Sequence, residues 1–267
     1  MARDTPRLYL RYAGISIRGQ MQYKTSFVLL TIGNFLATGM EFAGVLVLFD
    51  RFGSLRGWAL PEVALLYGMA HVAFALSEAF ARGFDVFARM IRAGDFDRVL
   101  LRPRSTVLQL AGQELQLMRI GRLAQGLFVL LWATHALEVS WSPARVALLL
   151  AAVAGGACLF SGLFVLQATM AFWTIESLEM MNTVTYGGVE TASYPLSIYR
   201  PWFRRFFTFC VPLASINFLP AHALLSRSVP GTSGWLLWLT PLVGVAFLGI
   251  SLQLWRFGVR HYRSTGS

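Results

Sequence analysis

Six charged side chains stand within the fourteen positions of "RAGDFDRVLLRPRS" (92–105), in a chain that is otherwise mostly apolar. They are Arg92, Asp95, Asp97, Arg98, Arg102 and Arg104. Gly94 allows a break, Asp95 can cap a short helix over Phe96–Leu101, and Pro103 stops that helix. Arg102 stands near its C-terminal end, where the helix dipole favours a cation. Such a helix suits contact with another protein, and the alternative is a solvated loop that only connects two membrane spans.

A second polar pattern follows helical spacing later in the chain. Glu179, Thr183, Tyr186 and Glu190 stand at i, i+4, i+7 and i+11, which places them on one face of a helix. In a membrane span, this face is expected to turn to a partner subunit or a cavity, and we assign it to a transport pathway. The alternative is packing against other helices through internal hydrogen bonds.

Glu41 lies about two-thirds along the first apolar run. Ionisable groups at such depth are costly and usually face the protein interior. Glu41 therefore faces either a helix seam or transport path, or the outer headgroup region near Arg51. We include it among the candidate pathway residues.

The sequence contains none of the catalytic motifs that we searched for. The single lysine, Lys24, has no glycine-rich phosphate loop around it, and there is no Gly-x-Ser-x-Gly motif. Both cysteines stand in apolar stretches and are interpreted as small buried residues. The histidines are scattered and are interpreted as structural or surface residues rather than metal ligands; they are His71, His135, His222 and His261. We therefore predict no catalytic residue and no metal, so that energy must come from an ion gradient or a partner.

The elements that hold these residues are predicted from composition. Of the 267 residues, 56% are hydrophobic and only 13% are charged, against about 25% charged in soluble domains. A helix needs roughly 20 residues to cross a bilayer. The runs that reach this length are Ser26–Phe49, Leu60–Phe80, Leu123–Trp141, Val146–Trp173 and Trp235–Trp255. The fold class is thus an all-α polytopic membrane protein, with residues 1–267 forming a single transmembrane domain.

The basic residues predict the orientation, because cytoplasmic loops collect Lys and Arg. The net charge of +10 is therefore interpreted as an orientation signal and not as nucleic-acid binding. With the N-terminus inside, sixteen basic residues lie inside and seven outside. Both termini are then cytoplasmic, which requires an even number of spans, and we predict six. Residues 6–23 are expected to form a helix on the membrane surface, since Arg7, Arg11 and Arg18 share one side of it.

The fifth span has two candidates, Thr183–Tyr199 and Phe206–Leu225. Charge alone favours the second, because the basic residues at 200, 204 and 205 would then lie inside. Pro212 and Pro220 argue against it, since they break the run into short pieces that suit a re-entrant hairpin buried in protein. Small residues in the fourth span, at Ala147, Ala151 and Gly155, predict a close helix contact.

The segment after the second span resembles a known family. Its pattern is close to I-R-x-G-x-x-D-x-x-L-L-R-P and consists of Ile91, Arg92, Gly94, Asp97, Leu100, Leu101, Arg102 and Pro103. Further likeness lies in "AFWT" (171–174), "YPLSIYRPWFRRFF" (194–207) and "NFLPAHALL" (217–225). Together these stretches are similar to the membrane subunit of bacterial type 2 ATP-binding cassette (ABC) exporters.

This resemblance implies a six-span half-transporter in the bacterial inner membrane. Thr183–Tyr199 would be the fifth span and Phe206–Leu225 an outer re-entrant hairpin. The loop after the second span would be a coupling helix that docks on an ABC ATPase subunit. This partner would bind ATP and magnesium, whereas the present chain binds no cofactor. The docking residues would be Arg92, Gly94, Asp95, Asp97, Arg98, Arg102 and Pro103. A second permease chain, identical or paralogous, and membrane lipid complete the expected partners.

The function that follows from the resemblance is ATP-driven export, and the absence of an obviously charged pore surface favours an amphiphilic or lipid-like substrate or drug. The pathway candidates are Glu41, Glu179, Thr183, Tyr186 and Glu190. An ion-coupled secondary transporter is the alternative, but the chain lacks the internal repeats expected there. A membrane-embedded enzyme is disfavoured by the missing nucleophile and metal clusters.

Overall fold

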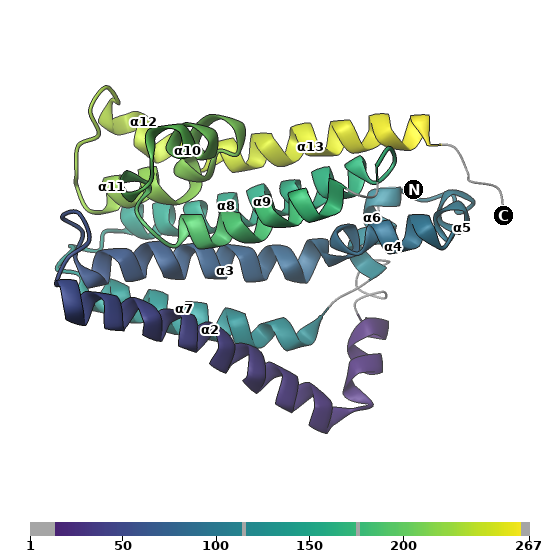
Figure 1. The fold of residues 1–267 in the computed structure, drawn as a ribbon, viewed down its shortest axis with the longest axis horizontal. Coiled ribbons are helices and arrows are strands. Elements are labelled where there is room, and N and C mark those ends of the chain that lie inside the picture. The colour runs from purple at the N-terminus through teal and green to yellow at the C-terminus, as the bar shows by residue number, and fades with distance from the viewer. Residues whose placement is uncertain (1–13, 114–115, 175–176, 263–267) are drawn as a thin grey trace.

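The long helices of the protein run side by side along one axis (Figure 1). The computed structural model describes residues 14–113, 116–174 and 177–262, and this part of the chain is helical without a β-sheet. The long helices are α2 (Lys24–Phe52), α3 (Leu60–Asp85), α7 (Ile120–Ala136), α8 (Pro143–Met170), α9 (Ser177–Ala192) and α13 (Leu242–His261). The all-α fold class predicted from the apolar runs is confirmed.

Short elements gather at the two ends of this bundle (Figure 1). One end holds α4 (Phe87–Arg92), α5 (Phe96–Leu100) and α6 (Thr106–Gln113), followed by the 3₁₀ turn η1 (Leu117–Arg119). The other end holds η2 (Leu196–Ile198), α10 (Pro201–Arg205), η3 (Phe206–Cys210), η4 (Ala214–Phe218), α11 (Leu219–Leu224) and α12 (Gly234–Leu239). We call these ends the α5 end and the α11 end.

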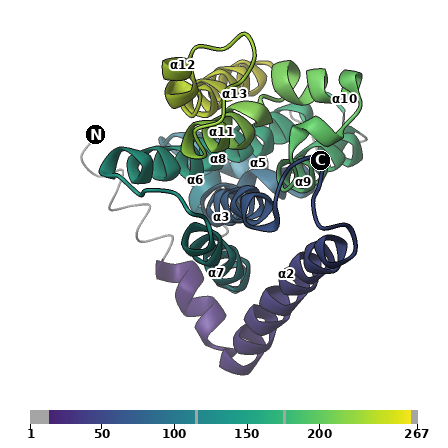
Figure 2. The same cartoon turned by 90° about the vertical axis from the view of Figure 1, so that its left-hand side faces the viewer.

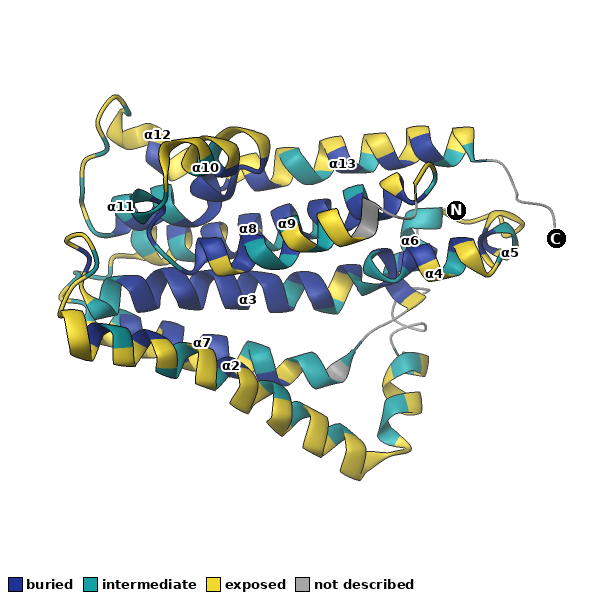
Figure 3. Cartoon of the chain, in the orientation of Figure 1, coloured by how far each residue is buried: buried dark blue, intermediate teal, exposed yellow. Residues whose placement is uncertain are grey.

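The central helices of the bundle are α3 and α8. Viewed along the axis, α2 and α7 lie to one side of α3, and α13 lies on the far side of α8 (Figure 2). Figure 3 shows α3 buried along most of its length, whereas much of the surface of α2 is exposed. Exposed residues of α2 include Leu29, Leu36 and Met40. An apolar helix face without a protein partner is suited to lipid or to a second subunit.

The N-terminal helix before α2 is only partly described. Residues 14–21 are helical and meet α2 at a steep angle (Figures 1 and 2). Arg18 is exposed on it, whereas Arg7 and Arg11 lie outside the described residues. The predicted surface position of this helix stays a prediction.

A close contact between α8 and α13 depends on two glycines. A Cβ atom at Gly155 would lie 2.4 Å from the carbonyl oxygen of Pro241, and one at Gly244 would lie 2.0 Å from the carbonyl oxygen of Gly155. The predicted close contact is confirmed at Gly155 but is wrong at Ala147 and Ala151, which are exposed. Each step of four residues turns about 40° around a helix, so that Ala147 and Gly155 face about 80° apart.

Among the described residues, four helices are long and apolar enough to cross a membrane: α2, the stretch Leu60–Arg92, α8 and α13. The helices α7 and α9 have 17 and 16 residues and fall just short of the usual length. The fifth span expected over Thr183–Tyr199 starts earlier, at Ser177, and ends at Ala192. Pro195 explains this end, because the residue before a proline avoids the helical conformation. The six-span count itself stays a prediction.

The segment expected to form a re-entrant hairpin is bent sharply. Pro201–Cys210 and Ala214–Leu224 meet at 82°, and the two could count together as a broken fifth span or as a re-entrant loop. The break falls at Pro212, as expected. Asn217 anchors the second piece, since its amide nitrogen donates to the carbonyl oxygens of Leu66, at 3.1 Å, and of Ala192.

Candidate functional site

The charged stretch at the α5 end folds into two short helices. Gly94 separates them with a φ of +69°, a backbone conformation that glycine adopts readily. The second, α5, ends at Leu100, shortly before Pro103. The predicted cap by Asp95 is wrong, because its backbone is already helical and its side chain makes no capping bond. Its carboxylate instead lies 3.4 Å from a guanidinium nitrogen of Arg98.

The outward side of this segment presents an apolar side chain among arginines. Leu101 is 84% exposed, and the side chain of Arg98 is 82% exposed. Arg92 and Arg102 are exposed as well. Beside it, a cavity of about 700 Å³ opens between residues 14–21 and the helices α4 to α6, with Arg98 and Arg102 in its lining. This surface has the apolar centre and basic rim that a protein partner can use.

The inward side of α5 is an aromatic contact. Phe96 is fully buried, and its ring centroid lies 4.9 Å from Phe87 of α4, 5.6 Å from Phe172 and 5.2 Å from Tyr262. Trp255 of α13 completes the cluster at 6.1 Å from Phe96. Phe172 lies two residues beyond the end of α8, and Tyr262 directly follows α13. A displacement of α5 therefore acts directly on the ends of two long helices, since close-packed interiors transmit strain.

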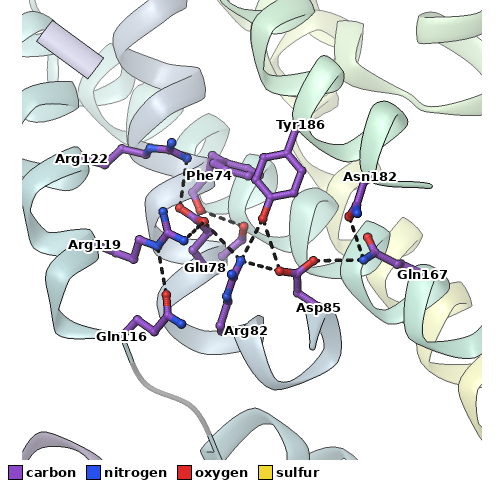
Figure 4. Close-up of polar contacts among 11 residues, drawn as sticks. Phe74, Glu78, Arg82, Asp85, Gln116, Arg119, Arg122, Gln167, Asn182 and Tyr186 are labelled. Carbon is purple, nitrogen blue, oxygen red and sulfur yellow. Dashed lines mark hydrogen bonds and ion pairs between the residues drawn. The ribbon is translucent and has the colours of Figure 1, made fainter. Parts of the chain in front are cut away.

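A buried ion cluster lies deeper in the bundle, next to the α5 end (Figure 4). Glu78 of α3 is fully buried, with one carboxylate oxygen 3.3 Å from Arg119 and 3.7 Å from Arg82. Its other oxygen lies 3.1 Å from Arg122 of α7. Burial lowers the pKa of the Arg119 guanidinium, and the Glu78 carboxylate opposes that shift.

The cluster continues from Arg82 to Asp85, which form a close ion pair (Figure 4). Asp85 accepts hydrogen bonds from the Gln167 amide, at 3.0 Å, and from the Tyr186 hydroxyl, at 3.3 Å. The same Gln167 nitrogen donates to Asn182 at 3.0 Å. These contacts join α3, α8 and α9, and an adjoining cavity of about 320 Å³ is lined by residues of all three helices.

The cluster holds α3 to its neighbours through charge. Three arginines face two carboxylates, which leaves one excess positive charge in a mostly buried place. Buried charges are tolerated when they are paired, so separation of these helices would leave costly unpaired groups. Sequence analysis missed this cluster, although Glu78 and Arg82, four residues apart in an apolar run, were a visible signal.

The residues of the predicted polar stripe on α9 lie in different surroundings. Tyr186 turns into the ion cluster and accepts a hydrogen bond from Arg82 at 2.9 Å. Glu179 and Thr183 are exposed, and the Thr183 hydroxyl donates to the Glu179 carbonyl at 2.9 Å. Glu190 lies apart from them, close to another pathway candidate.

That neighbour of Glu190 is Glu41, which shares its surroundings with His71. One ligand atom from each of these three side chains lies within 4.8 Å of the other two. Both glutamates are exposed, whereas His71 is buried. The structure thus brings together two of the predicted pathway residues, from α2 and α9, and adds a histidine of α3 that was predicted to be structural.

Comparison with known proteins identifies one family. A family model described as ABC-2 family transporter protein matches residues 35–266, which is most of the chain. No curated protein and no solved structure matches the sequence.

Proposed function

The chain belongs to the ABC-2 transporter family, and on that premise we propose that it exports an amphiphilic or lipid-like substrate or drug from the cytoplasm. As a permease of an ABC transporter it is a multi-pass membrane protein. The observation that carries the ATP-driven part of this proposal is the segment around α5, from Arg92 to Pro103, whose outer and inner sides have different surroundings. Its outward side is free to bind a partner, and its inward side packs on the ends of α8 and α13.

In this proposal the ATPase docks on the segment from Arg92 to Pro103. Leu101 enters an apolar site on the partner, while Arg98 and Arg102 pair with acidic side chains around it. Asp95 holds Arg98 through their ion pair, and Asp97 adds a further charge to α5. The partner ATPase binds ATP and magnesium, and its movement reaches the membrane spans through Phe96.

The proposed membrane topology has six spans: α2, α3, α7, α8, α9 and α13. At 1.5 Å per residue, α7 and α9 extend about 24–26 Å, which approaches the thickness of the hydrocarbon core, about 30 Å. The α5 end faces the cytoplasm of a bacterium, so that both termini lie inside. Pro201–Leu224 is then an outer re-entrant hairpin, which its 82° bend and the anchoring of Asn217 support.

The proposed transport path lies beside Glu41 and Glu190. Both are exposed on a single chain, and exposure of two carboxylates to lipid is costly. A second permease chain, identical or paralogous, that covers α2 and α9 removes this cost and encloses a path between the two chains. The test is Glu190→Ala. It should lower transport while the complex still assembles, whereas loss of the complex would instead indicate a packing role.

The proposed function is tested by purifying the tagged chain from its native membrane. We expect an ABC ATPase and a second permease chain to copurify, and amphiphilic compounds to stimulate ATP hydrolysis after reconstitution. The alternative, an ion-coupled secondary transporter, predicts no ATPase and transport that collapses with the ion gradient. Finding that second pattern would refute the proposal.

A further inference from the structure

The group formed by Glu41, His71 and Glu190 has the donor atoms of a metal site. A carboxylate oxygen from each glutamate and one imidazole nitrogen lie within 4.8 Å of one another. They come from three separate helices, α2, α3 and α9. A shared zinc ion would draw these atoms closer together, because zinc holds imidazole and carboxylate ligands at about 2.0–2.2 Å.

His71 is the observation that points to a ligand. It is only 1% exposed, and neither ring nitrogen has a hydrogen-bond partner among the described residues. Its ring stacks on Tyr67 at 3.9 Å between centroids, and the Tyr67 hydroxyl donates to the Thr38 carbonyl at 2.9 Å. The imidazole is therefore held in place by packing, while its polar atoms stay available.

Neither carboxylate is held by an ion pair in the part of the chain that the structure describes. Within the described residues, no Lys or Arg side chain forms an ion pair with Glu41 or Glu190. Arg122 of α7 acts on Glu190 through space, but its guanidinium forms its ion pair with Glu78, at 3.1 Å. Two carboxylates this close repel each other unless a positive charge lies between them.

The depth of the group strengthens this requirement. Glu41 lies about three helical turns, or roughly 16 Å, before the end of α2 at Phe52. His71 lies about as far beyond the start of α3 at Leu60. The group thus lies well inside the span, where charge is poorly solvated.

We propose that Glu41, His71 and Glu190 bind a divalent transition-metal ion of the zinc type between α2, α3 and α9. Imidazole combined with carboxylate selects such ions over calcium and magnesium, which prefer oxygen ligands alone. Three protein donors leave a fourth position for water or for a donor group of another molecule. The bound ion neutralises the carboxylate pair and ties the exposed helix α2 to α9. This inference does not depend on the direction of transport or on the partner ATPase.

The experiment measures binding of Zn²⁺ and Co²⁺ to the full-length chain in lipid nanodiscs, after removal of any polyhistidine tag. Titration calorimetry follows Zn²⁺, and the visible absorption of Co²⁺ reports the nitrogen and oxygen ligands. The variants are Glu41→Gln and Glu190→Gln, which keep side-chain size at exposed positions and should leave the fold intact. Asp50→Asn is the control, since it removes another exposed carboxylate of α2.

We expect saturable binding of about one ion per chain. It should weaken by at least about tenfold in each glutamate variant and stay unchanged in Asp50→Asn. His71→Gln should additionally shift or weaken the visible Co²⁺ absorption, because the nitrogen ligand is lost. The proposal is overturned if the chain binds no Zn²⁺ saturably, or if both glutamate variants bind it as the unaltered chain does. Should His71→Gln fail to fold, the two glutamate variants decide the question alone.

Discussion

Glu78 has no exposure to solvent, yet three guanidinium groups lie within 4.0 Å of its carboxylate. Their side chains are 15–17% exposed, so that little water screens the interaction. Arg122 also places its guanidinium 5.2 Å from the ring centroid of Phe74. The carboxylate therefore balances charges from α3, η1 and α7 at a single point.

Replacement of Glu78 by Gln should destabilise the protein strongly. The amide keeps the size of the side chain but leaves three arginines facing only Asp85. Removal of one partner from a buried ion pair typically costs about 3–5 kcal/mol. The midpoint of thermal unfolding in detergent should fall clearly below that of the unaltered chain.

Asp95→Asn is the matched control, because its ion pair with Arg98 is largely exposed and such pairs contribute at most about 1 kcal/mol. Equal unfolding midpoints for Glu78→Gln and Asp95→Asn would contradict the role given to the ion cluster.

The contacts between distant residues explain what sequence analysis missed. The partners of Glu78 on η1 and α7 follow it by about forty positions, and no local pattern connects them. His71 was interpreted as structural for the same reason, since Glu41 and Glu190 come from other helices. Only Glu78, Arg82 and Asp85, which stand at i, i+4 and i+7 on α3, were visible as a local signal.

At the scale of elements, the proposal gives the two sides of α5 different roles, docking on the outer side and transmission of movement on the inner side. Its exposed side chains and its buried ring point to different surroundings. Phe96→Ala should therefore leave ATPase copurification unchanged while weakening the response of ATP hydrolysis to substrate. Truncation of a buried phenylalanine typically costs about 3–5 kcal/mol of packing.

Phe209→Ala serves as its control, since this ring at the α11 end is 81% exposed. Normal substrate stimulation in a well-expressed Phe96→Ala complex would argue against transmission through the aromatic cluster.

The contact of α8 with α13 offers a second test at this scale. Gly244→Ala should lower the yield and unfolding midpoint of the folded chain, because the new Cβ atom would overlap the Gly155 carbonyl. Overpacking of this kind typically costs about 1–3 kcal/mol.

Gly249→Ala lies on the same helix, where nothing stands within 4 Å of an added Cβ atom, and it should be tolerated. If both alanine variants behave alike, the close approach of the two helices does not limit stability.

The existence of the helices could be predicted from the sequence better than the residues at which they end. Apolar run length indicated the long helices, and glycine and proline marked the break at Gly94 and the bend at Pro212. The expected cap by Asp95 failed because the helical backbone there prevents the capping geometry. The predicted contacts of Ala147 and Ala151 were wrong because residues spaced by four turn progressively around the helix and do not share one face.

For the whole molecule, the topology gives a direct prediction. Single cysteines at Ser105 and Ser228, both exposed, would stand at opposite ends in a chain lacking Cys158 and Cys210. An impermeant thiol reagent added to intact cells should label the cysteine at position 228 and spare the one at position 105. Labelling at position 105 but not at position 228 would show that the chain has the opposite orientation.

Membership of the ABC-2 transporter family implies an ABC ATPase partner, and docking of that partner on the segment around α5 is the central claim. The most direct measurement compares ATPase copurification by the unaltered chain and by Leu101→Asp. Leu101 is 84% exposed, so that the substitution should not disturb the fold but would bury a charge in the proposed interface. We expect copurification to fall by about tenfold or more, because a desolvated, unpaired charge in an interface costs about 2 kcal/mol or more. Expression and the unfolding midpoint should stay normal. Wild-type copurification in Leu101→Asp would contradict docking at this segment.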